Sequence, residues 1–219
     1  DIFSLGETSI FNTSIVDQIK NHVFQKNFET EKYVLNIDVS ELEKNIMIKY
    51  QNYLPKNNKQ NFFIDKSLEN FFNIESILKV FPNAKFINTK RNYKDSVIAI
   101  YQAMLPDLPW THSISDILKY MDNYIKLINF YEKKYSNQIL TINLEELTNN
   151  QKFYTKKLLK FCNLSWTPEI LEFYKKKNFV VKTLSNIQLR NKITPYNQTK
   201  YKPYEKILEN FRNKYDWLN

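Results

Sequence analysis

The sequence of 219 residues contains a single glycine, Gly6, and this scarcity excludes one large class of nucleotide sites. Walker and dinucleotide-binding loops need several glycines, because their backbone turns tightly and approaches the phosphates closely. Neither kind of loop can be built from these residues. Kinase or NTPase activity that depends on a Walker loop is therefore disfavoured.

Cysteine and histidine are almost as rare. Cys162 is the one cysteine, which excludes an internal disulfide and a thiolate cluster for a structural metal. With His22 and His112 as the two histidines, a histidine-rich metal centre is not expected either. We therefore predict no metal cofactor. The cysteine content favours a reducing compartment, and we expect a cytoplasmic protein.

The sequence also lacks any apolar run close to the roughly 20 residues that span a bilayer. Its first residues do not show the basic-then-apolar pattern of a secretory signal. What is present argues for a packed, soluble globule, since 42% of the residues are hydrophobic and 16% are aromatic. The length fits one domain over residues 1–219.

The net charge of +9 predicts an anionic partner. Phosphorylated cofactors, acidic peptides, glycans, nucleic acids and anionic membranes all carry the required charge. The lysine runs at 156–157 and 175–177 are interpreted as solvated helix faces rather than binding stripes. A nucleic-acid-binding protein is the alternative function, but it is disfavoured because the aromatic residues follow core periodicities and no known nucleic-acid-binding motif is present.

The stretch from residue 61 to residue 91 predicts a strand, a helix and a second strand. Residues 61–66 form an apolar run typical of a buried strand, and residues 84–90 predict another strand. Between them, apolar positions fall on one helical stripe: Phe71, Phe72, Ile74, Leu78, Val80 and Phe81. Such a unit joins two parallel strands with right-handed topology.

A cation follows each of these strands. Because the carboxyl ends of parallel strands open onto the edge where α/β proteins bind ligands, we expect Lys66 and Arg91 to lie on one edge. A helix that starts within residues 92–95 would add its dipole, giving a phosphate or sulfate site. The alternative is that Lys66 and Arg91 are ordinary surface charges at strand ends.

The rest of the chain predicts further helices and one more strand. Ser113 and Asp116 have the form of a capping box at the start of a long amphipathic helix. A buried strand is expected at 138–144, helices at 151–162, 168–177 and 202–217, and a less regular segment at 180–199. The aromatic stripes are interpreted as core.

Seven segments resemble, in the same order, the landmarks of one enzyme family. They read FIDK (63–66), FPNAKF (81–86), RNYKDS (91–96), LPWTH (108–112), LEEL (144–147), LLKFCNLSW (158–166) and VKTLSNIQ (181–188). This order is similar to that of the sulfotransferases that use 3′-phosphoadenosine 5′-phosphosulfate (PAPS), of the tyrosylprotein and bacterial "sulfotransferase 3" type. The resemblance covers the chain from Gly6 to about Lys202.

The resemblance implies a P-loop-like α/β fold with a central parallel sheet in three layers. It also implies transfer of a sulfuryl group from PAPS to an acceptor hydroxyl or amine, with 3′-phosphoadenosine 5′-phosphate (PAP) as the product. In this family a lysine at the position of Lys66 stabilises the departing charge, and an arginine at the position of Arg91 holds the 3′-phosphate. Both residues are present here.

Glu7 resembles the glutamate of the Gly-Glu element that supplies the general base in tyrosylprotein sulfotransferases. A carboxylate suits this role, because it can take the acceptor's proton as the bond to sulfur forms. The alternative is that Glu7 is a solvated acid. His112 is the second candidate for the base, although we expect it to make a structural hydrogen bond at a helix start.

Four residues near the C-terminus complete the site that the resemblance implies. Ser185 matches a serine near the transferred group, and Lys200 matches a basic residue that contacts the nucleotide. Gln188 and Arg190 belong to the stretch 185–190, which would cover the cofactor.

The sequence departs from the family at two nucleotide contacts. A serine that usually joins the arginine on the 3′-phosphate is replaced by Ala99. Ser96 lies one helical turn earlier and is expected to substitute for it, since positions three apart are neighbours on a helix. An aromatic residue that usually precedes the acidic pair is Leu144 here.

A third departure concerns the phosphate-binding loop. Family members carry a Gly/Ser/Thr loop before the glutamate, whereas only six residues precede Glu7. We interpret the sequence as a fragment that lacks the first strand and this loop, with loss of the motif as the alternative. The chain by itself is then expected to bind the cofactor poorly and turn over slowly. A catalytically dead relative that acts as a scaffold stays an alternative, and the acceptor and oligomeric state are left open.

Overall fold

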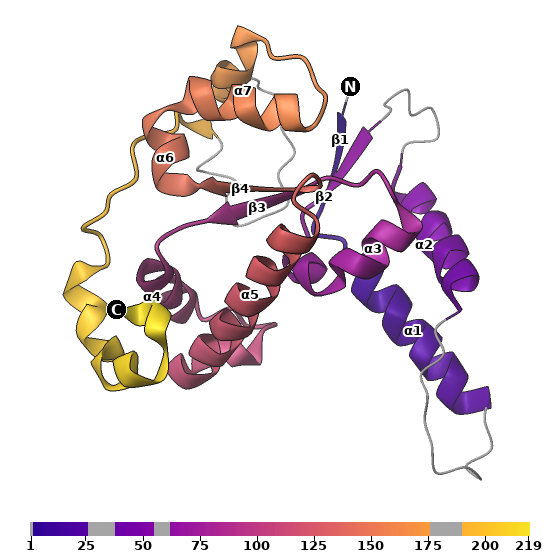
Figure 1. Cartoon of the computed structure of the whole chain (residues 1–219), viewed down its shortest axis with the longest axis horizontal. Coiled ribbons are helices and arrows are strands. Elements are labelled where there is room, and N and C mark those ends of the chain that lie inside the picture. The colour runs from indigo at the N-terminus through magenta and orange to yellow at the C-terminus, as the bar shows by residue number, and fades with distance from the viewer. Residues whose placement is uncertain (1, 26–37, 55–61, 176–189) are drawn as a thin grey trace. The chain divides into compact units, whose positions relative to one another are not determined.

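The computed structural model describes residues 2–25, 38–54, 62–175 and 190–219. The chain forms two compact units, Asp1–Ala84 and Lys85–Asn219, coloured from indigo to magenta and from magenta to yellow in Figure 1. Each unit contains a pair of parallel strands accompanied by helices. The predicted α/β class with parallel strands is therefore confirmed, whereas the single domain over 1–219 stays a prediction.

In its described residues, the first unit has two short parallel strands and four helices. Its elements are β1 (Ile2–Gly6), α1 (Ile10–Gln25), α2 (Val39–Tyr53), β2 (Phe62–Asp65), the 3-10 helix η1 (Leu68–Asn73) and α3 (Ile74–Val80). The register runs from Ile2 opposite Phe62 to Gly6 opposite Asp65, with an irregularity between Ser4 and Gly6. The aromatic rings of Phe11, Tyr50, Phe63 and Phe81 pack against one another.

Two features of this unit differ from the sequence prediction. The first three elements were not predicted, although Asp38 caps α2 by accepting hydrogen bonds from the amides of Ser40 and Glu41. The burial predicted for β2 is wrong, because Phe62, Phe63 and Ile64 are 37–50% exposed. The described ladder partner of β2 is one short strand, which covers less of it than the large sheet that an apolar run suggests.

The second unit is built around another parallel pair. Its elements are β3 (Phe86–Lys90), α4 (Tyr93–Ala103), η2 (Pro109–His112), α5 (Ile114–Lys134), β4 (Ile139–Asn143), α6 (Leu144–Asn149), α7 (Gln151–Phe161), η3 (Pro168–Lys175), η6 (Lys202–Lys214) and η7 (Asp216–Leu218). β3 and β4 pair without interruption from Phe86 opposite Ile139 to Lys90 opposite Asn143. The predicted strands at 84–90 and 138–144 are confirmed.

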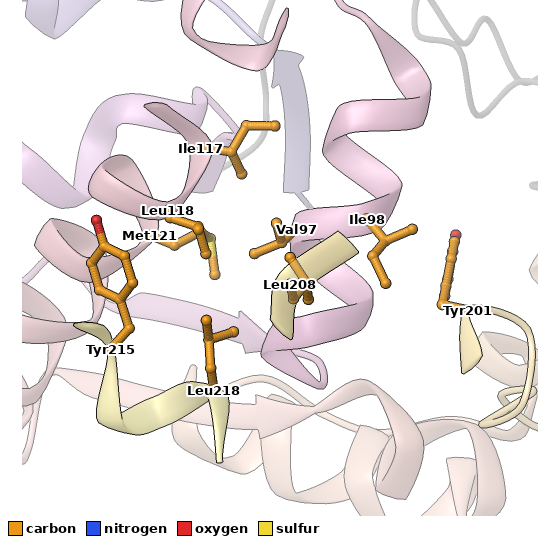
Figure 2. Packing of buried hydrophobic residues seen from close by; sticks show 9 residues of the cluster. All are labelled: Val97, Ile98, Ile117, Leu118, Met121, Tyr201, Leu208, Tyr215 and Leu218. Atoms are coloured by element: carbon orange, nitrogen blue, oxygen red, sulfur yellow. The ribbon is translucent and has the colours of Figure 1, made fainter. Parts of the chain in front are cut away.

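The core of this unit joins its helices to the C-terminal segment. Figure 2 shows nine buried side chains from α4, α5 and the last nineteen residues: Val97, Ile98, Ile117, Leu118, Met121, Tyr201, Leu208, Tyr215 and Leu218. Two tyrosines belong to this set, which agrees with the interpretation of the aromatic stripes as core. Burial of this apolar surface holds the C-terminal segment against α4 and α5.

The helices of this unit begin largely where the sequence predicts. Ser113 caps α5 by accepting a hydrogen bond from the amide of Asp116. The described part of the segment predicted as a helix at 168–177 forms the 3-10 helix η3, and the segment predicted at 202–217 contains the 3-10 helices η6 and η7. Non-helical backbone angles at Glu172 interrupt the first of them. Among the described helices, none has the length and apolar character that crossing a membrane requires.

Candidate functional site

In the first unit, two candidate catalytic residues follow neighbouring strands. Glu7 comes directly after β1, and Lys66 comes directly after β2. Because these strands are parallel, their carboxyl ends lie at the same edge. Lys66 Nζ donates a hydrogen bond to Glu7 Oε1 at 2.7 Å, and the two side chains are 59% and 54% exposed. An acid and a cation thus meet where ligands of α/β proteins bind.

The backbone at Gly6 directs Glu7 toward this edge. Gly6 has φ of +77°, in the left-handed region that favours glycine, and its carbonyl accepts a hydrogen bond from the amide of Lys66 at 2.7 Å. A Cβ at this position would meet no atom within 4 Å. The backbone conformation, and not lack of space, therefore explains why the single glycine of the chain lies here.

Asp65 connects the two turns that carry these residues. Its Oδ2 accepts hydrogen bonds from the hydroxyls of Thr8 and Tyr50, both at 2.7 Å. Its Oδ1 accepts from the amide of Ser67 at 2.9 Å and from the Ser67 hydroxyl at 2.6 Å. Burial raises the pKa of Asp65, but these hydrogen bonds outweigh it and lower the pKa below its usual value.

Sequence reasoning missed this network, since it treated Asp65 only as the polar end of a strand. A local signal exists, because hydroxyl residues stand in both turns: Thr8 and Ser9 after β1, and Ser67 after β2. The contribution of Tyr50 carries no such signal. It comes from α2, which was not predicted, and its own pKa is raised by burial and by the hydrogen bond to Asp65.

In the second unit, Arg91 follows β3 and precedes α4. Its Nε donates a hydrogen bond to Ser96 Oγ at 3.2 Å, and its guanidinium lies 5.8 Å from the ring centre of Tyr201. Asn92 caps α4 through the amide of Asp95. The structure therefore joins the predicted residues Arg91 and Ser96 at a helix N-terminus, which suits an anion.

The segment before Tyr201 is fastened to this same region. The hydroxyl of Tyr196 donates to Asp95 Oδ2 at 2.7 Å, and its amide donates to Thr148 Oγ1 at 3.0 Å. Burial raises the pKa of Tyr196, the hydrogen bond to Asp95 raises it further, and Arg91 opposes the shift. No sequence pattern indicates this contact, because Tyr196 and Asp95 lie 101 positions apart.

The remaining predicted residues are distributed as follows. Lys200 is exposed, with its Nζ 5.0 Å from the ring centre of Tyr201, and Arg190 is exposed. Ala99 is half-buried and packs against the core cluster of Figure 2. Ser185 and Gln188 lie outside the described residues.

Two further predictions concern His112 and metal ligands. His112 Nε2 lies 3.1 Å from the carbonyl oxygen of Leu105, which agrees with the structural hydrogen bond expected just before α5. Within the described ranges, no three His, Cys, Asp or Glu side chains are grouped so that they could hold a metal ion.

Lys66 and Arg91 lie in different compact units. Lys66 and Glu7 belong to the first compact unit, and Arg91, Ser96 and Lys200 belong to the second. Each group is described within its own unit, and their convergence stays a prediction.

Comparison with known proteins identifies the family. The model of the family described as "Sulfotransferase family" matches residues 10–168, which is well over half of the chain. The chain belongs to the sulfotransferase family. This range includes Lys66, Arg91, Ser96 and Ala99, whereas Glu7, Arg190 and Lys200 lie outside it. Sulfotransferase membership supports sulfuryl transfer as the class of chemistry.

A relative in Aquifex aeolicus (strain VF5), described as "Uncharacterized protein", is 34% identical to this sulfotransferase-family chain over 156 residues. The match takes in 66% of the chain and 19% of the relative. The chain therefore spans about a fifth of the length of this relative.

Proposed function

We propose that the protein transfers a sulfuryl group from PAPS to an acceptor hydroxyl. The observation that carries the proposal is the Lys66–Glu7 pair at the carboxyl ends of β1 and β2, with 2.7 Å between Nζ and Oε1. It places a cation beside a carboxylate at a ligand-binding edge, in a chain whose family transfers sulfuryl groups.

The chemistry of the residues fits a donor with two separate phosphate groups. Lys66 offers a compact ammonium with three donors, which suits the charge of a leaving phosphate. Arg91 offers a planar guanidinium at the N-terminus of α4, which suits a terminal phosphate such as the 3′-phosphate. Ser96, held beside Arg91, supplies a hydroxyl in place of the family serine that Ala99 replaces.

The donor, when bound, supplies an electrophilic sulfur attached to a phosphate that departs with the S–O bonding pair. Glu7 then accepts the proton of the acceptor hydroxyl as the new O–S bond forms. Lys66 Nζ, which pairs with Glu7 in this structure, turns its charge to the oxygen where negative charge develops. These residues align the acceptor with the donor and neutralise the developing negative charge. They form no covalent bond with the substrate.

Arg91 is assigned to binding rather than to the transfer itself. Its Nε is engaged by Ser96, so the guanidinium plane is held in one orientation. A cation–π contact with the ring of Tyr201 restricts it further. A pre-oriented guanidinium pays less conformational entropy when it binds a phosphate. Lys200, next to Tyr201, and the exposed Arg190 are proposed as further basic contacts to the nucleotide.

Ser185 and Gln188 are included in the proposed site only because they resemble residues of the family.

The acceptor classes consistent with the net charge of +9 are an acidic peptide tyrosine, a glycan and a small-molecule hydroxyl. A cytoplasmic location is proposed from the cysteine content and is independent of the site.

The test is transfer of radiolabelled sulfur from PAPS by the product of the complete gene. Three acceptors are supplied in parallel: an acidic tyrosine peptide, a glucosamine-containing disaccharide and 2-naphthol. We expect label on at least one acceptor in the wild type and none above background in Lys66→Ala. Lys49→Ala is the matched control, because Lys49 is a lysine of the same unit whose ion pair is with Asp17 and not with Glu7.

Absence of transfer to all three acceptors and to water, in a protein that binds PAP, would favour a catalytically dead relative. Salt-dependent binding of single-stranded RNA without any response to PAP would favour the nucleic-acid-binding alternative. Either result overturns the proposal.

A further inference from the structure

The carboxylate of Asp65 is saturated with hydrogen bonds. Each of its oxygens accepts two, from Thr8 and Tyr50 on Oδ2 and from the amide and hydroxyl of Ser67 on Oδ1. Three of the donors are hydroxyls, which could as well be satisfied by water if they lay at the surface. Instead they converge on one partly buried acid. Four donors from three separate segments of the chain are therefore held together by Asp65.

The network continues from Asp65 into both turns at the strand ends. The hydroxyl oxygen of Ser67 also accepts a hydrogen bond from the amide of Ser9 at 2.8 Å. The hydroxyl oxygen of Thr8 also accepts a hydrogen bond from the amide of Ile10, the first residue of α1, at 3.2 Å. These two hydroxyls therefore donate to Asp65 and accept from amides that follow β1. One carboxylate thereby fixes the path of the chain from β1 into α1.

Glu7 and Lys66 are the two residues that this network encloses. Glu7 lies between Gly6, whose carbonyl accepts the Lys66 amide, and Thr8, which is bonded to Asp65. Lys66 lies between Asp65 and Ser67. Their side chains are more than half exposed, so packing does little to orient them. Their direction is set by the backbone on either side, and that backbone is held through Asp65.

We infer that Asp65 is a positioning residue, which holds the turns of Glu7 and Lys66 in register so that acid and cation face each other across the transferred group. The inference rests on the proposed function of Glu7 and Lys66. Asp65 is not proposed to contact the substrate. Its effect is on the rate of transfer, because a displacement of about 1 Å in a reacting group costs about 100-fold.

The alternative to positioning is a purely structural role, in which Asp65 stabilises the first unit without affecting the turns selectively. Tyr50 makes this alternative testable. Its ring is buried against Phe63 and Phe81, and only its hydroxyl reaches Asp65. Tyr50→Phe keeps the ring packing and removes one of the four hydrogen bonds. A positioning network weakens under this change, whereas a core contact does not.

The first measurement is amide hydrogen exchange in the product of the complete gene, without nucleotide. In Asp65→Ala, we expect the amides of Ser9 and Ser67 to exchange about tenfold faster or more, since their acceptors are lost or released. Amides of β3 and β4 should be unchanged. Asp65→Asn keeps an acceptor for Ser67 and should restore part of the protection. Asp17→Ala, which removes an exposed carboxylate of the same unit, is the control.

The second measurement is PAP release from PAPS, which follows transfer to any acceptor, water included. In Asp65→Ala the kcat should fall about 100-fold, while the KM for PAPS changes little. Tyr50→Phe should lower kcat by a smaller factor, in the same direction. If Asp65→Ala does not fold, the exchange and kinetics of Tyr50→Phe and Asp65→Asn decide the matter.

Two outcomes separate this inference from the proposed function. If Glu7→Gln and Lys66→Ala lose activity but Asp65→Ala, or the folded Tyr50→Phe and Asp65→Asn, keep wild-type kcat and amide protection, the positioning role is refuted alone. If Glu7→Gln and Lys66→Ala both keep full activity, the proposed function fails first, whatever Asp65 does.

Discussion

The ion pair between Lys66 and Glu7 is exposed, and this separates its chemistry from its contribution to stability. Exposed ion pairs typically contribute about 0–1 kcal/mol to the free energy of unfolding. Replacing either partner should therefore leave the fold intact. Loss of activity in such variants reports on the reaction, and the two partners are expected to fail in different ways.

Glu7→Gln removes the proposed base and keeps the shape of the side chain. The rate of PAP release should fall about 100-fold or more, the contribution typical of general base catalysis. The affinity for PAP, measured by calorimetry, should stay close to that of the wild type, since Glu7 is not assigned to the nucleotide. A large loss of PAP affinity in this variant would contradict the assignment.

Arg91→Lys keeps the charge but loses the planar fork. We expect the affinity for PAP to fall about tenfold, because the geometry of bidentate phosphate binding is lost. The affinity for adenosine 5′-phosphate, which has no 3′-phosphate, should change much less. Calorimetric titration with both nucleotides gives the comparison, and Arg212→Lys in the exposed last turn of η6 is the control. Equal losses for both nucleotides would refute a 3′-phosphate role.

The lowered pKa of Asp65 also predicts how the stability of the protein depends on pH. Its pKa is lowered in the folded state, so the ionised carboxylate raises the free energy of unfolding at pH values above the unfolded pKa of about 3.9. That stability is lost as the pH falls through the folded pKa. The free energy of unfolding of the wild type, measured with urea, should therefore exceed that of Asp65→Asn at pH 6. The difference between the two proteins should shrink below about pH 4. A difference that is constant from pH 6 to pH 3 would show that ionised Asp65 adds nothing.

At the scale of elements, the strands and helices of the second unit were predictable and those of the first largely were not. β3 begins with the apolar pair Phe86–Ile87, β4 is mostly apolar, and Ser113 marks the start of α5 with a cap. β1 reads IFSLG, which shows neither a continuous apolar run nor a strict alternation. The strand pairing itself depends on residues some sixty positions apart, from Ile2 to Phe62.

The candidate site divides in the same way. Lys66 and Arg91 could be found from the sequence, because strand ends are recognisable and cations there are informative. The residues that hold them in place could not, since Tyr50 and Tyr196 reach Asp65 and Asp95 through tertiary packing. The segments at 168–177 and 202–217 show a limit of another kind: hydrophobic period predicts a helix but does not distinguish 3-10 from α backbone.

The hydrogen bond from Tyr196 to Asp95 connects the C-terminal segment to α4. Asp95 is 4% exposed, so removing the hydroxyl that donates to it leaves a buried carboxylate with one partner fewer. Tyr196→Phe should lower the free energy of unfolding by about 1–3 kcal/mol, as measured by urea denaturation. Tyr204→Phe, at an exposed tyrosine of η6, should change it by less than about 0.5 kcal/mol. Equal effects would show that the Asp95 contact is not important.

At the scale of the whole molecule, the proposed donor has two separate anionic groups. PAPS carries a phosphosulfate at the 5′ position and a phosphate at the 3′ position of one ribose, and the proposed function assigns Lys66 to the first group and Arg91 to the second. The sequence predicts that these two cations follow the carboxyl ends of parallel strands. Binding of the product PAP measures whether each of them contributes.

The most direct measurement is calorimetric titration of PAP into the product of the complete gene, its Lys66→Ala and Arg91→Ala variants, and the double variant. We expect one binding site per chain, and about tenfold weaker binding or more in each single variant, because each loses a charge-assisted phosphate contact. Lys49→Ala should bind like the wild type. Wild-type affinity in either the Lys66 or the Arg91 variant would contradict the assignment of that residue to the donor.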